Sequence, residues 1–153
     1  AGVRWDLDRS TAAVLVVGYL LTGVTEELVW RGTVLQVLAP TGRTRAVLLG
    51  SALFGAAHLT NVLYRDGVGL VLGQAFGAFC FGVGYAAVWL RTGALPALMA
   101  AHALTDLLPH LGRLPAVPVF VAQDVVLLAV GLVLLHAAPR VVGPAADAQD
   151  RSS

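Results

Sequence analysis

The 153-residue chain is 58% hydrophobic and only 12% charged, whereas about a quarter of the residues in a soluble domain carry charge. All ten basic residues are arginine and the formal net charge is +1, which excludes a strongly basic surface, so we expect no nucleic-acid partner. The single cysteine, Cys80, excludes an intramolecular disulfide and a metal site built from cysteines. This composition is typical of an integral membrane protein.

Apolar runs of helix length follow one another along the chain, separated by arginine, glycine and proline. They predict an all-α, polytopic transmembrane helical bundle with about five membrane segments, at residues 10–38, 44–63, 68–90, 95–111 and 115–138. The third segment has no charged residue, and the fourth is short enough to be tilted or re-entrant. We expect one membrane-embedded domain over residues 1–138 and a disordered polar tail over residues 139–153.

Arg4 and Arg9 precede the first apolar run, as the positive residues of a signal peptide would. The run continues into Glu26 and Glu27 without a small-residue cleavage pattern, which favours a mature membrane helix. Because the chain does not begin with Met, we expect that further helices can precede it.

Small and polar residues of the third segment indicate how it packs. Gly69, Gly73 and Gly77 recur at every fourth residue, which predicts the close approach of a neighbouring helix along that face. Gln74 lies beside them, and we expect it to form an interhelical hydrogen bond rather than to contact a substrate.

The first of three polar clusters in these apolar runs contains Glu26, Glu27 and Arg31. A charged side chain at membrane depth costs about 2.5–3.5 kcal/mol on insertion scales, so membrane helices carry few of them without a function. Glu27 and Arg31 are four residues apart, about 40° around a helix, and are expected to pair. Glu26 lies outside that pair, and an unpaired carboxylate in a low dielectric accepts a proton readily, so it is the expected general base. The alternative is that both glutamates cap a helix near the membrane surface.

The other two clusters each contain a histidine. His58 lies one helical turn after Phe54, on the same face. A lone histidine on an apolar helix is more often structural than catalytic, so His58 by itself predicts little. His102 and Asp106 also share a face, where they either orient one another, line a pocket, bind a metal or form a self-satisfied polar pair.

Taken together, the clusters read Glu-Glu-x-x-x-Arg, then Phe-x-x-x-His, then His-x-x-x-Asp. On these motifs, residues 18–108 resemble the CPBP or Abi family of CAAX prenyl proteases and bacteriocin-processing enzymes. The resemblance implies an intramembrane endopeptidase with its site in a cavity between membrane helices and with no covalent enzyme intermediate. It further implies a peptide or membrane-protein substrate, through CAAX-type or leader-peptide processing, and the plasma membrane of a prokaryote.

Carried over residue by residue, the resemblance implies that Glu26 and His58 activate the water that attacks the scissile carbonyl. It implies that His102 and Asp106 stabilise the resulting oxyanion. The remaining motif residues would support the site: Glu27, Arg31 and Phe54.

Two questions about this chemistry stay open. The best-known eukaryotic members carry Asn where this chain has Asp106, and an ionised Asp cannot donate a hydrogen bond, so Asp106 is protonated, orients His102 or binds a metal. The chain lacks the His-Glu-x-x-His zinc motif, which favours a glutamate-activated water without tightly bound metal. The alternative is a divalent metal such as zinc, held by Glu26, His58 and His102. A non-enzymatic alternative is an immunity or regulatory membrane protein on the same scaffold.

Overall fold

The computed structural model describes residues 7–111 and 115–137, and all regular secondary structure in these two ranges is helical. The elements in chain order are α1 (Arg9–Glu27), the π-helical segment η1 (Leu28–Val34), α2 (Leu35–Leu38), the 3-10 turn η2 (Ala39–Thr41), α3 (Arg43–Ala57), the 3-10 segment η3 (His58–Leu63), α4 (Val68–Thr92), α5 (Leu95–Leu111) and α6 (Ala116–His136). The prediction of an all-α bundle is confirmed. The tail predicted at residues 139–153 lies outside the described residues.

Local sequence explains where individual helices begin and end. The side chain of Asp8 accepts a hydrogen bond of 2.9 Å from the Thr11 backbone N–H, which caps α1. Hydrogen bonds from the hydroxyl of Ser10 and from Thr11 hold the pKa of Asp8, which precedes the membrane stretch, well below its usual range. At the other end of the fold, α4 stops at Gly93, whose φ of 64° is a left-handed conformation that favours glycine.

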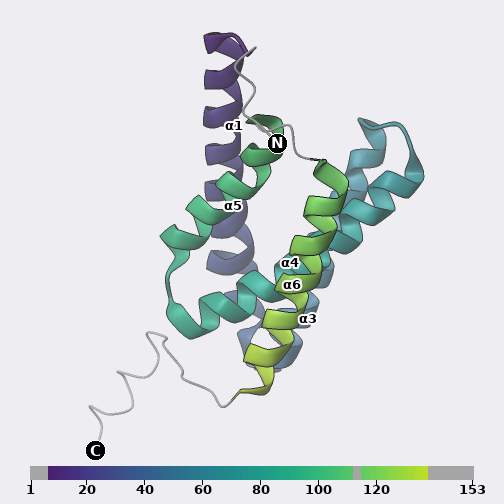
Figure 1. The fold of residues 1–153 in the computed structure, drawn as a ribbon. Helices are drawn as coiled ribbons and strands as arrows, with labels where there is room; N and C mark the ends of the chain where they lie inside the picture. Colours follow the sequence, from purple (N-terminus) through teal and green to yellow (C-terminus); the bar gives the residue numbers. More distant parts are fainter. Residues whose placement is uncertain (1–6, 112–114, 138–153) are drawn as a thin grey trace, which may run out of the picture.

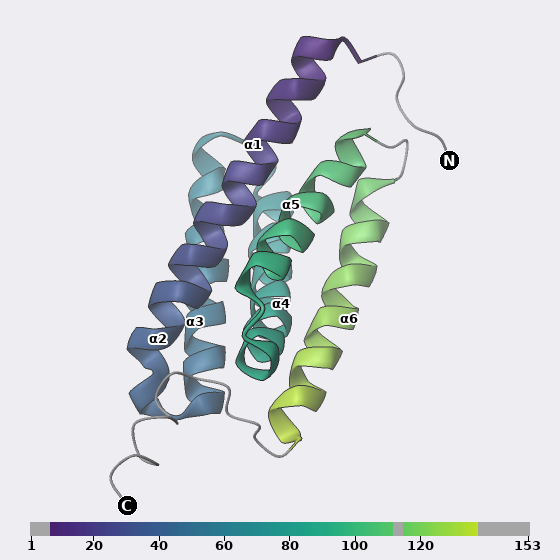
Figure 2. The ribbon, with the colours of Figure 1, turned by 90° about the vertical axis from the view of Figure 1, so that its left-hand side faces the viewer.

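The helices pack as two groups (Figures 1 and 2). In one group α1 lies along α5, and in the other α4 lies between α3 and α6. The groups meet where η1 and α2 contact α3 and where α5 contacts α4. The three polar clusters belong to α1 and η1, to α3 and η3, and to α5, so this packing gathers them at the junction of the two groups.

Glycine allows the two helices of the first group to approach closely. A Cβ atom added at Gly23 of α1 would lie 2.6 Å from the carbonyl oxygen of Met99 and 2.9 Å from the backbone nitrogen of Ala103, both on α5. No side chain fits at this distance, so α1 and α5 touch backbone to backbone at Gly23.

The glycine stripe predicted on α4 is only partly correct. Gly77 packs against the carboxylate of Asp124 on α6, but a Cβ at Gly69 or Gly73 would meet no atom within 4 Å. The prediction is wrong for these two residues because none of the described helices covers that face of α4 there. The backbones of α4 and α6 approach closely nearer the end of α4, where a Cβ at Gly84 would be 2.7 Å from the Leu127 carbonyl oxygen.

Within the described residues, four helical stretches are long and apolar enough to cross a membrane: Arg9–Thr41, Arg43–Leu63, Val68–Thr92 and Val117–His136. The 17 residues of α5 fall short of this length, in keeping with the short fourth segment expected from the sequence. Large apolar side chains such as Val14, Leu70 and Val126 remain exposed, which is stable where lipid rather than water surrounds the helices. The chain is an integral membrane protein.

Candidate active site

A buried ion pair at the end of α1 forms the base of the site. Arg31 Nη1 donates a hydrogen bond of 2.9 Å to Glu27 Oε1, and the two side chains are 2% and 0% exposed. The pairing of residues four apart, predicted from helical spacing, is therefore confirmed. Because removing one partner of a buried pair leaves an uncompensated charge, each of these residues depends on the other.

The helix changes its hydrogen-bonding pattern directly after the two glutamates. From Leu28 to Val34 the backbone is π-helical, and the Leu35 N–H donates to the carbonyl of Trp30, five residues earlier. Segments of this kind are rare and occur frequently at functional sites. The apolar pattern of the sequence contains no signal for this change, so it could not be predicted from the sequence.

Three aromatic rings surround the Arg31 guanidinium. Its Cζ atom lies 5.2 Å from the ring centroid of Phe54, 5.7 Å from that of Phe81 and 5.4 Å from that of Tyr85. Ring faces attract a cation more strongly once water is excluded, so these contacts favour the buried guanidinium. Phe81 and Tyr85 were not predicted from the sequence as residues of the site. Their spacing of four residues on α4 would have placed them on one face, but that spacing is equally typical of ordinary packing residues.

His102 of α5 is held in place by Glu27. Its Nδ1 lies 2.7 Å from Glu27 Oε1, the same oxygen that accepts the hydrogen bond from Arg31. With a hydrogen on Nδ1, the ring donates to this carboxylate and directs Nε2 to its other side. Helical spacing could not reveal this contact, because the two residues are 75 positions apart.

Two more carboxylates flank the Nε2 atom of His102. Glu26 Oε2 lies 3.7 Å from it and Asp106 Oδ2 lies 3.6 Å from it. Both separations are longer than a direct hydrogen bond. The side chains of Glu26 and Asp106 are 31% and 29% exposed, so both are accessible to water or substrate, whereas Glu27 is fully buried. Glu26 thus lies outside the Arg31 ion pair, as expected, and the residue that orients His102 is Glu27 rather than Asp106.

His58 is the first residue of η3 and stays close to Phe54. Its Nδ1 lies 2.9 Å from the Phe54 carbonyl oxygen, and the two rings meet edge to face with centroids 4.7 Å apart. Within the described part of the chain, His58 forms no hydrogen bond or ion pair with Glu26 or Asp106. The structure therefore places His58 against Phe54, whose ring also contacts Arg31, without a hydrogen bond to either carboxylate.

The segment that carries His58 is tied to α4. Asn61 Nδ2 donates a hydrogen bond of 2.9 Å to Gln74 Oε1. The interhelical hydrogen bond predicted for Gln74 is confirmed, and its partner lies one turn beyond His58.

The described residues contain no group of three His, Cys, Asp or Glu side chains arranged to hold a metal ion. Glu26, His58 and His102, the set expected for zinc, therefore do not form a three-ligand site in this arrangement. In this arrangement the three donors do not fit a zinc ion, so the reaction proposed for the site is carried by side chains and water alone.

A family model described as type II CAAX prenyl endopeptidase, Rce1-like, matches residues 8–108. The chain belongs to the Rce1-like family. The match includes all three polar clusters and confirms the resemblance inferred from the motifs. Rce1-like membership supports CAAX-type intramembrane protease activity in general, with a peptide substrate at a lipid bilayer, and does not favour the non-enzymatic alternative. The chain has no significant match among curated proteins or among solved structures.

Proposed function

We propose that the chain is an intramembrane endopeptidase that cleaves a prenylated CAAX-type peptide with a water molecule activated by Glu26 and His58. The observation that carries this proposal is the arrangement around His102. Glu27 holds one ring nitrogen, while the accessible carboxylates of Glu26 and Asp106 flank the other at 3.7 and 3.6 Å. The description of the Rce1-like family supports the substrate class, and the motif resemblance alone supports the plasma membrane of a prokaryote.

In the first step Glu26 accepts a proton from a water molecule as the water oxygen attacks the scissile carbonyl carbon. His58 helps to orient this water through Nε2, because its Nδ1 is already bonded to the Phe54 carbonyl. The attack forms a C–O bond and places a negative charge on the former carbonyl oxygen. Glu26 suits the role because its carboxylate is accessible and is not neutralised by Arg31.

In the second step the charged oxygen is stabilised by hydrogen-bond donors. With both ring nitrogens protonated, His102 donates from Nε2 to the oxyanion, while its Nδ1–H remains bonded to Glu27. Asp106, whose Oδ2 lies 3.6 Å from Nε2, donates a second hydrogen bond in its protonated form. Donors fixed in this way act on the transition state without having to reorganise.

In the last step the tetrahedral intermediate collapses and the C–N bond breaks. Glu26 returns its proton to the departing amine, so that one water and one peptide bond give a carboxyl terminus and an amino terminus. The buried Glu27–Arg31 pair takes no part in proton transfer and keeps His102 in its orientation.

The decisive experiment compares wild type with Glu26→Gln, each reconstituted in lipid vesicles with a farnesylated CAAX peptide. Mass spectrometry in water enriched in oxygen-18 should show one heavy oxygen in the new carboxyl terminus. We expect turnover by Glu26→Gln to fall at least about 100-fold, as for loss of a general base. Equal unfolding temperatures of the two proteins serve as the control for folding.

Equal turnover by the two proteins would reject Glu26 as the base. An unprenylated copy of the peptide tests the substrate class, because cleavage of both peptides at the same rate would contradict recognition of the prenyl group. If neither peptide is cut, new peptide termini that appear in cell membranes with wild type but not with Glu26→Gln would point to leader-peptide processing instead. The absence of such termini would favour the immunity or regulatory role.

A further inference from the structure

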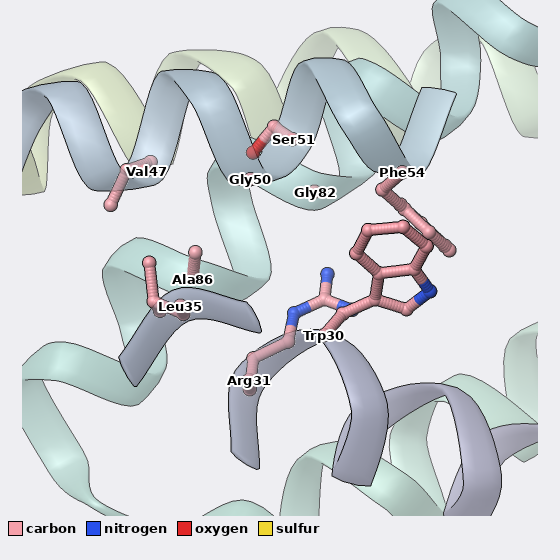
Figure 3. Close-up of a pocket in the computed structure, with 9 residues that line it drawn as sticks. All are labelled: Trp30, Arg31, Leu35, Val47, Gly50, Ser51, Phe54, Gly82 and Ala86. Carbon is pink, nitrogen blue, oxygen red and sulfur yellow. The ribbon is translucent and has the colours of Figure 1, made fainter. Parts of the chain in front are cut away.

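A small cavity lies beside Arg31, between η1, α3 and α4 (Figure 3). Its volume is about 10 Å³, and most of its wall is apolar, with contributions from Leu35, Val47 and Ala86. Two polar side chains also line it, those of Arg31 and Ser51. The cavity is separate from the accessible carboxylates, because neither Glu26 nor Asp106 belongs to its wall.

Both polar side chains bring a buried atom without a hydrogen-bond partner to this cavity. Within the described residues, neither Arg31 Nη2 nor Ser51 Oγ makes a hydrogen bond. The two residues are 2% and 3% exposed. Figure 3 shows the guanidinium of Arg31 and the hydroxyl of Ser51 pointing toward the same space between η1 and α3. Buried donors are rarely left unpaired, especially on a charged group, because lost solvation is not recovered.

Ser51 differs in this respect from the hydroxyls on other helices of this protein. Thr22, Thr92 and Thr105 each donate to a backbone carbonyl four residues earlier in the chain. A helical serine often does the same. The Ser51 hydroxyl makes no such bond, so its hydrogen-bonding capacity is directed to the cavity.

We propose that the cavity binds one internal water molecule, which accepts hydrogen bonds from both Arg31 Nη2 and the Ser51 hydroxyl. A volume of about 10 Å³ is at the lower limit for a single water, which also needs at least two polar partners. The same volume excludes a larger ligand. An anion is not required, since Glu27 already neutralises Arg31.

The water makes Ser51 a positioning residue for the site. The two terminal nitrogens of Arg31 belong to one rigid, planar group, so anchoring Nη2 also sets the direction of Nη1. Nη1 binds Glu27 Oε1, and that oxygen holds Nδ1 of His102. Ser51 on α3 is thereby linked to His102 on α5. This second part of the proposal rests on the proposed function, whereas the water site itself does not.

The water site is tested by an experimental structure of the wild-type protein at about 2 Å resolution, where ordered water is visible. We expect a single peak within hydrogen-bond distance, about 2.7–3.2 Å, of both Arg31 Nη2 and Ser51 Oγ. In Ser51→Ala the peak should disappear or leave its place. An empty cavity in the wild type, or a direct Arg31–Ser51 hydrogen bond, would overturn the proposal. An anomalous peak after soaking in bromide would do so too, since it would identify an anion site.

The positioning role is tested by kinetics on the same variant. Ser51→Ala should lower kcat about 3- to 10-fold, in line with the loss of one hydrogen bond, and leave KM unchanged. Thr41→Val is the matched control, because it removes an exposed hydroxyl bonded to the Leu38 carbonyl of its own helical turn, and it should keep wild-type kcat. Unchanged kcat in Ser51→Ala would reject the positioning role, provided that Glu26→Gln is inactive. If Glu26→Gln is as active as wild type, the proposed function is rejected. The water peak then still shows whether the cavity binds a water molecule.

Discussion

Glu27 Oε1 and His102 Nδ1 lie 2.7 Å apart, although the two residues are separated by 75 positions in the chain. The contact joins α1 to α5, the pair of helices that pack backbone to backbone at Gly23, one turn before Glu27. The distance between these helices therefore decides whether a carboxylate already paired with Arg31 also reaches the imidazole.

Gly23→Ala should impair the site without changing any of its side chains. The added Cβ would lie 2.6 Å from the Met99 carbonyl oxygen, so α5 has to move away from α1 and carry His102 with it. We expect the free energy of unfolding to fall by about 1–3 kcal/mol, as for other overpacked contacts, and kcat to fall with it. Gly73→Ala is the control, since a Cβ there meets no atom within 4 Å. Equal activity of the two variants would show that the close approach at Gly23 does not matter.

Glu27→Gln should strongly destabilise the fold, because it leaves the Arg31 guanidinium buried without its counter-charge. Breaking a buried pair from one side costs about 3–5 kcal/mol of unfolding free energy. The double variant Glu27→Gln/Arg31→Met should lose less than the sum of the two single variants, since no unpaired charge remains. Denaturant unfolding of all four proteins in detergent measures this coupling, and additive effects would contradict the ion pair.

Asp106→Asn should keep kcat within a few-fold of wild type if the residue acts as a hydrogen-bond donor to the oxyanion. Asp106→Ala removes the donor and should lower kcat at least about 100-fold. Steady-state kinetics on the cleaved peptide separates these outcomes, with unfolding temperatures as the folding control. Complete loss of turnover in Asp106→Asn would instead require a negative charge or a metal ligand at this position.

Asn61 and Gln74 should contribute to activity only as a pair. Their hydrogen bond of 2.9 Å ties η3, which begins at His58, to α4. Asn61→Ala and Gln74→Ala should each lower kcat modestly, and the double variant should lose no more than either single one. The expected coupling is about 0.6 kcal/mol, the size found by double-mutant cycles for interhelical hydrogen bonds inside a membrane protein. Independent effects of the two substitutions would show that the hydrogen bond does not position His58.

Much of the fold follows directly from the sequence. Apolar runs and their Gly, Pro and Arg boundaries predicted the order of the helices, because helix length and hydropathy are local properties. Contacts within one helical turn were equally accessible: Glu27 pairs with Arg31 because residues four apart share a helix face. The three motifs also named the cluster of polar residues that the packing brings together at the junction of the two helix groups.

Contacts between helices were decided by the tertiary structure alone. Three features join residues from different helices. They are the hydrogen bond between Glu27 and His102, the contacts of the Phe81 and Tyr85 rings with Arg31, and the cavity at Ser51. Periodicity shows which face of a helix a residue occupies, but not which helix covers that face or how closely. The same limit explains the wrong prediction for Gly69 and Gly73, which have the spacing of a packing stripe on a face that no helix in residues 7–111 and 115–137 covers. Helical geometry is set by neighbours in the chain, whereas the active site is assembled by the close approach of helices whose packing only the folded bundle determines.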